Sequence, residues 1–261
     1  MRLTMLSSRL RRLAGIVLAL VLWEVTSRSG VVSAEYLPGI GAVFSALIDF
    51  VTSAIFWDNL LISVLRALSG LVVAVAIAFA LAILAGRYAR VRRMLEPMSD
   101  FLRAIPPPAL IPVGIFAVGL TPGLYLLVIA FGCIWPIYIS AANALSAPEP
   151  VQMQMARTFG IGPWRTMWMI RLPAALPEAL TGLRLSASIA LLSAVATEML
   201  LGPNGLGALI FNAGFSLLWD DMYALMVVIG LTGLVFNMGV AAIRWLVAGW
   251  QVEMVKLGAS A

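Results

Sequence analysis

Residues 60–85, LLISVLRALSGLVVAVAIAFALAILA, contain a single charged side chain, Arg66. A membrane-spanning helix needs about 20 mostly apolar residues, so this run is long enough to cross a bilayer. Apolar residues make up 62% of the whole chain and charged residues only 11%, against roughly a quarter charged in soluble domains. A water-soluble fold could not bury so many apolar side chains, so we expect an integral membrane protein.

Five more apolar blocks surround this run, at residues 13–26, 105–120, 124–144, 180–201 and 222–247. The sequence therefore predicts an all-α integral membrane protein with about six transmembrane helices. We divide it into an N-terminal helix with an exported segment (1–59), a membrane core (60–250) and a short tail (251–261). Pro106, Pro107, Pro108 and Pro112 cannot all lie inside one regular helix, so the third span is predicted to be broken or to begin late.

The positive charges orient these helices. All but two of the 17 Lys and Arg residues fall in the N-terminal stretch, in the loops after the second and fourth blocks, or in the tail. The exceptions are Arg28 and Arg66. Because cytoplasmic loops collect Lys and Arg, we expect both termini to lie in the cytoplasm.

The first block has a second interpretation. Its arginines, its apolar stretch and the tripeptide Val32-Ser33-Ala34 are also typical of a cleaved signal peptide. Further along, Val43, Leu47 and Val51 recur at helical spacing and predict either an interfacial helix or a packed connector. The sequence leaves both alternatives open.

The composition also argues against several classes of function. The chain has no histidine, its only lysine is Lys256, and its only cysteine is Cys133 within an apolar block. This removes the histidine-based protease and triad signatures and leaves no Ser/Lys pair within the membrane. We predict no catalytic residue, no metal site and no cofactor bound by this chain. The arginines cluster at the ends of apolar blocks, which is a topology signal and no sign of nucleic-acid binding.

The loop at residues 146–173 contains helix signals of its own. Ser146 and Glu149 form a capping box, and Val151, Met155 and Phe159 then share one helix face. Gly160 can adopt the left-handed conformation that ends a helix. Pro163 suits the first turn of a second short helix, whose apolar side holds Trp164, Met167 and Trp168. These side chains either form a docking surface or pack back onto the chain's own helices.

The order of residues in this loop is similar to that of a known family. Ala156-Arg157-Thr158-Phe159-Gly160 and, after residues 161–169, Ile170-Arg171-Leu172-Pro173 resemble the EAA loop of ABC importer permeases. The resemblance implies the type I permease fold, with a cytoplasmic coupling helix between helices 4 and 5 that fits a groove of the ATPase subunit. The residues implied in coupling are Gln154, Ala156, Arg157, Thr158, Phe159, Gly160, Trp164, Ile170, Leu172 and Pro173. Gln154 departs from the glutamate usual in the family.

The resemblance covers most of the chain from about residue 63 and is strongest to permeases for nitrate, taurine and alkanesulfonates. It implies a homodimer, two ATPase subunits that bind ATP and Mg, and an extracytoplasmic solute-binding protein. It also implies a location in the inner membrane and a small solute of anionic type. A stand-alone secondary carrier, an intramembrane enzyme and a scaffold without transport remain as alternatives.

Six residues within or beside the apolar blocks are candidates for the pathway or its gates: Arg66, Pro108, Ser193, Thr197, Glu198 and Asn237. A charge in the membrane normally faces a cavity or a partner, so Glu198 is predicted to pair or to line a gate. Arg66 either extends toward the interface or presents its charge to an anion. The hydroxyl and small residues either pack helices together or line a solute path.

Overall fold

The computed structural model describes residues 2–33, 35–146 and 150–258, and the side chains between residues 14 and 243 within those ranges. Every regular element in these ranges is helical. Four helices are long and apolar enough to cross a membrane: Ala54–Arg87, Pro122–Ser146, Pro163–Leu201 and Trp219–Ile243. A bent pair, Ala89–Leu102 with Pro107–Val118, makes a fifth if it is counted as one span.

Three helices form the centre of the bundle: α3 (Ala54–Arg87), α6 (Pro122–Ser146) and α9 (Leu172–Leu201). Small residues bring them together, as is common between membrane helices. A Cβ atom added to Gly182 on α9 would lie 2.6 Å from the carbonyl oxygen of Pro136 on α6, so the two backbones touch here. Ala74 and Ala78 on α3 are fully buried at the same core. The predicted role of these small residues in packing is consistent with this arrangement.

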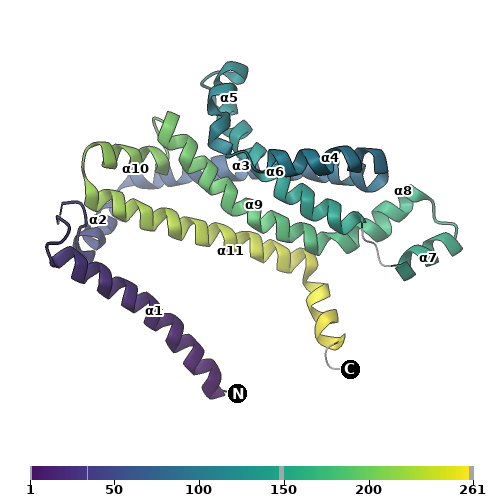
Figure 1. Cartoon of the computed structure of the whole chain (residues 1–261), viewed down its shortest axis with the longest axis horizontal. Helices are drawn as coiled ribbons and strands as arrows, with labels where there is room; N and C mark the ends of the chain where they lie inside the picture. Colours follow the sequence, from purple (N-terminus) through teal and green to yellow (C-terminus); the bar gives the residue numbers. More distant parts are fainter. Residues whose placement is uncertain (1, 34, 147–149, 259–261) are drawn as a thin grey trace.

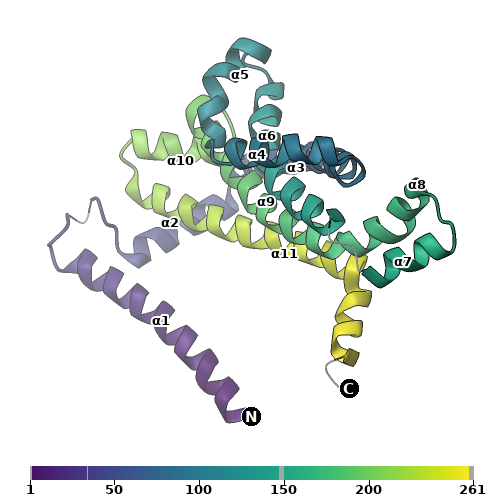
Figure 2. The ribbon, with the colours of Figure 1, turned by 45° about the vertical axis from the view of Figure 1, so that its right-hand side comes forward.

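The prolines of the predicted third span follow a sharp bend, which makes this segment either a broken span or a re-entrant loop. It consists of α4 (Ala89–Leu102), a 3-10 turn (Pro107–Leu110) and α5 (Ile111–Val118), with a bend of 98° between the two halves. The sequence reading missed α4, because its arginines and carboxylates resemble an ordinary charged loop. In both views α5 stands away from the centre of the bundle (Figures 1 and 2).

For the fifth span, the sequence predicted a separate short helix and then a membrane helix that begins at about residue 180. The structure differs. Helix α8 (Pro163–Thr166), a π-helical segment (Met167–Arg171) and α9 form one continuous helix. Pro173 lacks an N–H donor and would normally disrupt such a helix. The π-helical turns directly before it change the hydrogen-bond register, and this lets the helix pass through the proline.

The remaining elements mark the two ends of the bundle (Figure 1). Helices α2 (Ile40–Thr52) and α10 (Leu206–Phe215) lie at one end, and α7 (Pro150–Thr158) projects with α8 from the other. Helix α2 packs one face against α11 (Trp219–Gly258), as expected of a packed connector, and leaves the other face exposed. Helix α1 (Arg2–Arg28) contains the first apolar block and slants away from α11 (Figure 2).

Candidate functional site

The bend between α7 and α8 has the geometry that the sequence predicted for Gly160. This glycine has a φ of 63°, in the left-handed region. Its N–H donates to the carbonyl of Arg157 (3.1 Å), and the N–H of Ile161 donates to the carbonyl of Ala156 (2.9 Å). These two bonds form a Schellman motif, which closes the C-terminal end of α7. The predicted capping box at its other end includes Glu149, which lies outside the described residues.

The apolar side chains of α7 face outward. Val151, Met155 and Phe159 are 60%, 54% and 74% exposed, and they share one face of the helix. Trp164 on α8 and Trp168 in the π-helical segment are about half exposed. This favours the docking surface over packing against the chain's own helices. We call Val151, Met155, Phe159 and Trp164 the α7 surface.

The structure divides the coupling residues implied by the family resemblance into two groups. Gln154, Arg157, Thr158, Phe159, Gly160 and Trp164 are exposed on or beside α7 and α8. Ala156 is buried beneath them, and Ile170, Leu172 and Pro173 are half-buried where α9 begins. Leu172 packs against the main hydrophobic core. The second half of the motif therefore attaches the loop to the bundle, while the first half presents a surface.

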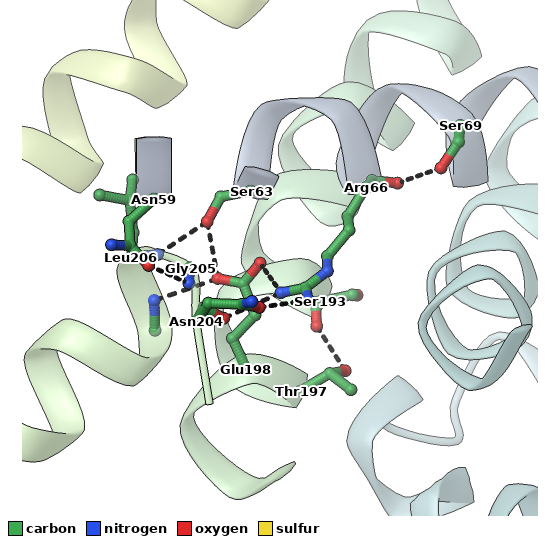
Figure 3. A network of polar contacts seen from close by, with 11 residues as sticks. Asn59, Ser63, Arg66, Ser69, Ser193, Thr197, Glu198, Asn204, Gly205 and Leu206 are labelled. Carbon is green, nitrogen blue, oxygen red and sulfur yellow. Dashed lines mark hydrogen bonds and ion pairs between the residues drawn. The ribbon is translucent and has the colours of Figure 1, made fainter. Parts of the chain in front are cut away.

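A second polar site lies toward the other end of the bundle, where α3, α9 and α10 meet (Figure 3). The carboxylate of Glu198 is fully buried. Its Oε1 atom accepts a hydrogen bond from Arg66 of α3 (2.9 Å), and its Oε2 atom accepts one from the Ser63 hydroxyl (2.7 Å). A buried carboxylate needs such partners because desolvation of an unpaired charge costs several kcal/mol. Glu198 therefore adopts the pairing role that the sequence suggested.

The same cluster completes the first turn of α10. The N–H groups at a helix start have no partner within the helix. Here, Gly207 donates to Glu198 Oε2 (3.1 Å), Leu206 donates to the Ser63 hydroxyl (2.8 Å), and Gly205 donates to the side-chain oxygen of Asn59. Side chains from α3 and α9 thus cap α10. Sequence reasoning missed α10, although Glu198 and the glycine pair at 205 and 207 were the signal for it.

Arg66 makes several further contacts in this cluster. Besides Glu198, it donates to the backbone carbonyl of Asn204 (3.0 Å) and to its side-chain oxygen (2.8 Å). Its guanidinium carbon lies 4.0 Å from the centre of the Tyr125 ring on α6, a cation–π contact. Because its charge is paired with Glu198, the geometry favours a structural role over the presentation of a positive charge to an anion. We call Asn59, Ser63, Arg66, Glu198 and Asn204 the Glu198 network.

The other pathway candidates lie at helix contacts. Thr197 is buried, and its hydroxyl donates to the carbonyl of Ser193 within α9 (2.7 Å). Asn237 of α11 donates to the Ser188 hydroxyl of α9 (2.8 Å). Pro108 lies in the 3-10 turn of the bent segment, which packs against α6. These positions favour helix packing over the lining of a solute path within one chain.

The apolar helices and the bent helix pair define a multi-pass membrane protein with a projecting loop and a buried ion pair between its helices. The chain belongs to the family of binding-protein-dependent transport system inner membrane components, whose pattern matches residues 74–248. It has the type I permease fold of that family and is a non-catalytic subunit of the inner membrane.

Individual relatives agree with this assignment. An ABC transporter permease protein of Methanocaldococcus jannaschii, whose name assigns no substrate, is 33% identical over 91% of this chain and 90% of its own length. The taurine transport system permease protein of Escherichia coli is 27% identical, with 90% and 87% covered. A nitrate import permease protein of Synechocystis is 31% identical, with 71% and 67% covered. The predicted subgroup is thereby confirmed.

Proposed function

We propose that two copies of this chain form the membrane channel of an ABC importer for a small oxyanion or zwitterion of the nitrate, sulfonate or taurine type. The names of the relatives support this substrate class. In this proposal an extracytoplasmic solute-binding protein delivers the solute, and two ATPase subunits drive its release into the cytoplasm. ATP and Mg are bound by those subunits and not by this chain.

The main support for the proposal is the exposure of the α7 surface. Its large apolar side chains are exposed on a segment that projects beyond the bundle, next to Gln154 and Arg157. Exposed apolar patches with a polar rim are typical of protein-binding sites. Because the Schellman motif closes α7, the segment is suited to transmit force from a partner. We therefore propose that the ATPase subunit binds this surface in the cytoplasm.

Copurification tests this contact. The chain is coexpressed with an ATPase subunit of an ABC importer for this substrate class, and the double variant Met155→Ala/Phe159→Ala is compared with the wild type. Aromatic anchors often contribute 2 kcal/mol or more to an interface, so we expect at least about tenfold less captured ATPase. The control is Phe44→Ala/Ile48→Ala on the exposed face of α2, which should capture the ATPase normally. Equal capture by both variants would refute the proposed contact.

The orientation is tested by cysteine labelling. The single native cysteine, Cys133, is buried and should not react with a membrane-impermeant maleimide. Thr158→Cys on α7 should react only in inside-out membrane vesicles, and Ser216→Cys after α10 only in right-side-out vesicles. The opposite pattern would place the α7 surface outside the cell and exclude an ATPase contact. Transport by the chain alone without ATP would instead support a secondary carrier.

A further inference from the structure

A cavity of about 240 Å³ lies between the end of α3 and the loop that carries α7 and α8. Three arginines from three different elements line it: Arg87 at the end of α3, Arg157 on α7 and Arg171 at the end of the π-helical segment. The other lining groups are apolar side chains, glycine and one threonine, and none carries a carboxylate. The cavity thus gathers three positive charges and no negative one.

The guanidinium groups keep most of their hydrogen-bonding capacity. Arg171 donates one bond, to the carbonyl of Gly86 (3.1 Å). Within the described part of the chain, none of the three arginines takes part in an ion pair, and the enclosed Nε atom of Arg87 has no partner. Each guanidinium has five N–H donors. Since neighbouring like charges repel and unpaired donors are costly to enclose, an anion in the cavity would relieve both costs.

The chemistry of the arginines specifies the kind of anion. Their planar donor pairs match the oxygens of phosphate groups, which arginine binds in a bidentate manner. A volume of about 240 Å³ admits a phosphate group. The cavity also lies at the end of a helix long and apolar enough to span a membrane, and basic pockets between membrane helices on the cytoplasmic side bind the headgroups of anionic lipids. We infer that this cavity is a binding site for a phosphate-type oxyanion, supplied by a lipid headgroup or by the soluble phase.

The site is separate from the α7 surface. Met153, Ala156 and Arg157 line the cavity, whereas Val151, Met155 and Phe159 are exposed on the opposite face of the same helix. A bound oxyanion would join the end of α3 to the back of α7 and leave the α7 surface free. If the proposed function is correct, the oxyanion stiffens the segment that the ATPase moves.

The experiment uses the full-length chain, purified without an ATPase and reconstituted in phosphatidylcholine nanodiscs. One arm adds phosphatidylglycerol to the nanodiscs in a phosphate-free buffer, and the other titrates inorganic phosphate into nanodiscs without anionic lipid. Binding is read as a rise in the thermal unfolding midpoint and as a retained adduct in native mass spectrometry. A response in the first arm identifies a lipid headgroup, and a response in the second identifies a soluble anion.

Variants identify the site. Arg157→Gln, whose side chain is exposed enough to change without disturbing the fold, and Arg87→Gln should each weaken the response about tenfold. The matched control is Arg165→Gln, because Arg165 is exposed on α8 and does not line the cavity. The inference is overturned if neither arm responds, or if Arg165→Gln weakens binding as much as Arg157→Gln. Since no ATPase is needed for binding, this outcome is independent of the test of the proposed function.

Discussion

Helix α10, whose start the Glu198 network caps, and helix α7 lie toward opposite ends of the bundle (Figure 1). The side chains of the two regions are used differently. In the network, a buried carboxylate, a guanidinium and a helix start satisfy one another within one chain. On the α7 surface, Met155 and Phe159 are 54% and 74% exposed. The first region is complete in the single chain, and the second presents groups that a partner would cover.

The contrast shows that substitutions of buried polar groups and of exposed apolar groups should have different effects in a membrane subunit. A buried ion pair adds little net stability, but removing one of its members leaves an unpaired charge. An exposed apolar side chain contributes almost nothing to the fold of the free chain. Substitutions in the network should therefore affect stability, and substitutions on the α7 surface should affect assembly.

The largest expected effect is that of Glu198→Ala. It leaves Arg66 without a counter-charge and the start of α10 without its acceptor, so we expect a loss of about 3–5 kcal/mol. The thermal unfolding midpoint in a single detergent is the measurement. Glu178→Ala is the control, because Glu178 is exposed on the same helix. Similar midpoints for both variants would show that the network does not stabilise the fold.

A somewhat smaller loss is expected for Gly205→Ala. This glycine has a φ of 108°, and an added Cβ would lie 2.3 Å from the carboxyl carbon of Glu198. Backbone strain costs about 1–2 kcal/mol and overpacking about 1–3 kcal/mol. Gly30→Ala separates the two effects, because Gly30 also has a positive φ of 72° but open space around it. If both variants lose the same stability, steric overlap with Glu198 does not matter.

Arg66→Lys should have a moderate effect. Lysine can keep the charge beside Glu198, but it cannot also reach both oxygens of Asn204 in the forked geometry of arginine. We expect a loss of about 1–2 kcal/mol in the same unfolding assay. Arg28→Lys in the exposed pair with Glu24 should change stability by less than about 0.5 kcal/mol. An unchanged midpoint for Arg66→Lys would show that Arg66 stabilises the fold through its charge alone.

The smallest effect on stability is expected for Phe159→Ala. Its ring is 74% exposed, so its removal should change the free energy of unfolding by less than about 0.5 kcal/mol. Phe56→Ala removes the same side chain from a position that is 3% exposed and should cost about 3–5 kcal/mol. A large loss for Phe159→Ala would mean that the α7 surface supports the fold of the single chain.

The sequence predicted six membrane spans, and the described residues contain four helices long and apolar enough to cross a membrane, or five with the bent pair. These were recognised because their signal is local. Four apolar blocks, the prolines of the third block and the left-handed Gly160 need only neighbouring residues to be recognised. The continuity of α8 with α9 was not predicted, because Pro173 and Pro177 normally argue for a helix boundary. The π-helical segment that resolves this conflict has no recognisable sequence signal.

The coupling residues were easier to predict than the Glu198 network, again because the signal of the coupling residues is local. The coupling residues follow one another along the chain, so their order sufficed to identify the loop. The Glu198 network instead joins Ser63 and Arg66 to Glu198, and Asn59 to Gly205, across more than 130 positions. Its members could be suspected one at a time, as Arg66 and Glu198 were, but their pairing depends on how α3 packs against α9.

The unbroken helix from Pro163 to Leu201 has a mechanical consequence. Its 39 residues extend over about 58 Å, more than the thickness of a bilayer. It begins beside Trp164 and ends three residues after Glu198, with no intervening loop to absorb a displacement. The backbone hydrogen bonds of one helix, including its π-helical segment, therefore connect the residues beside Trp164 to the loop before α10.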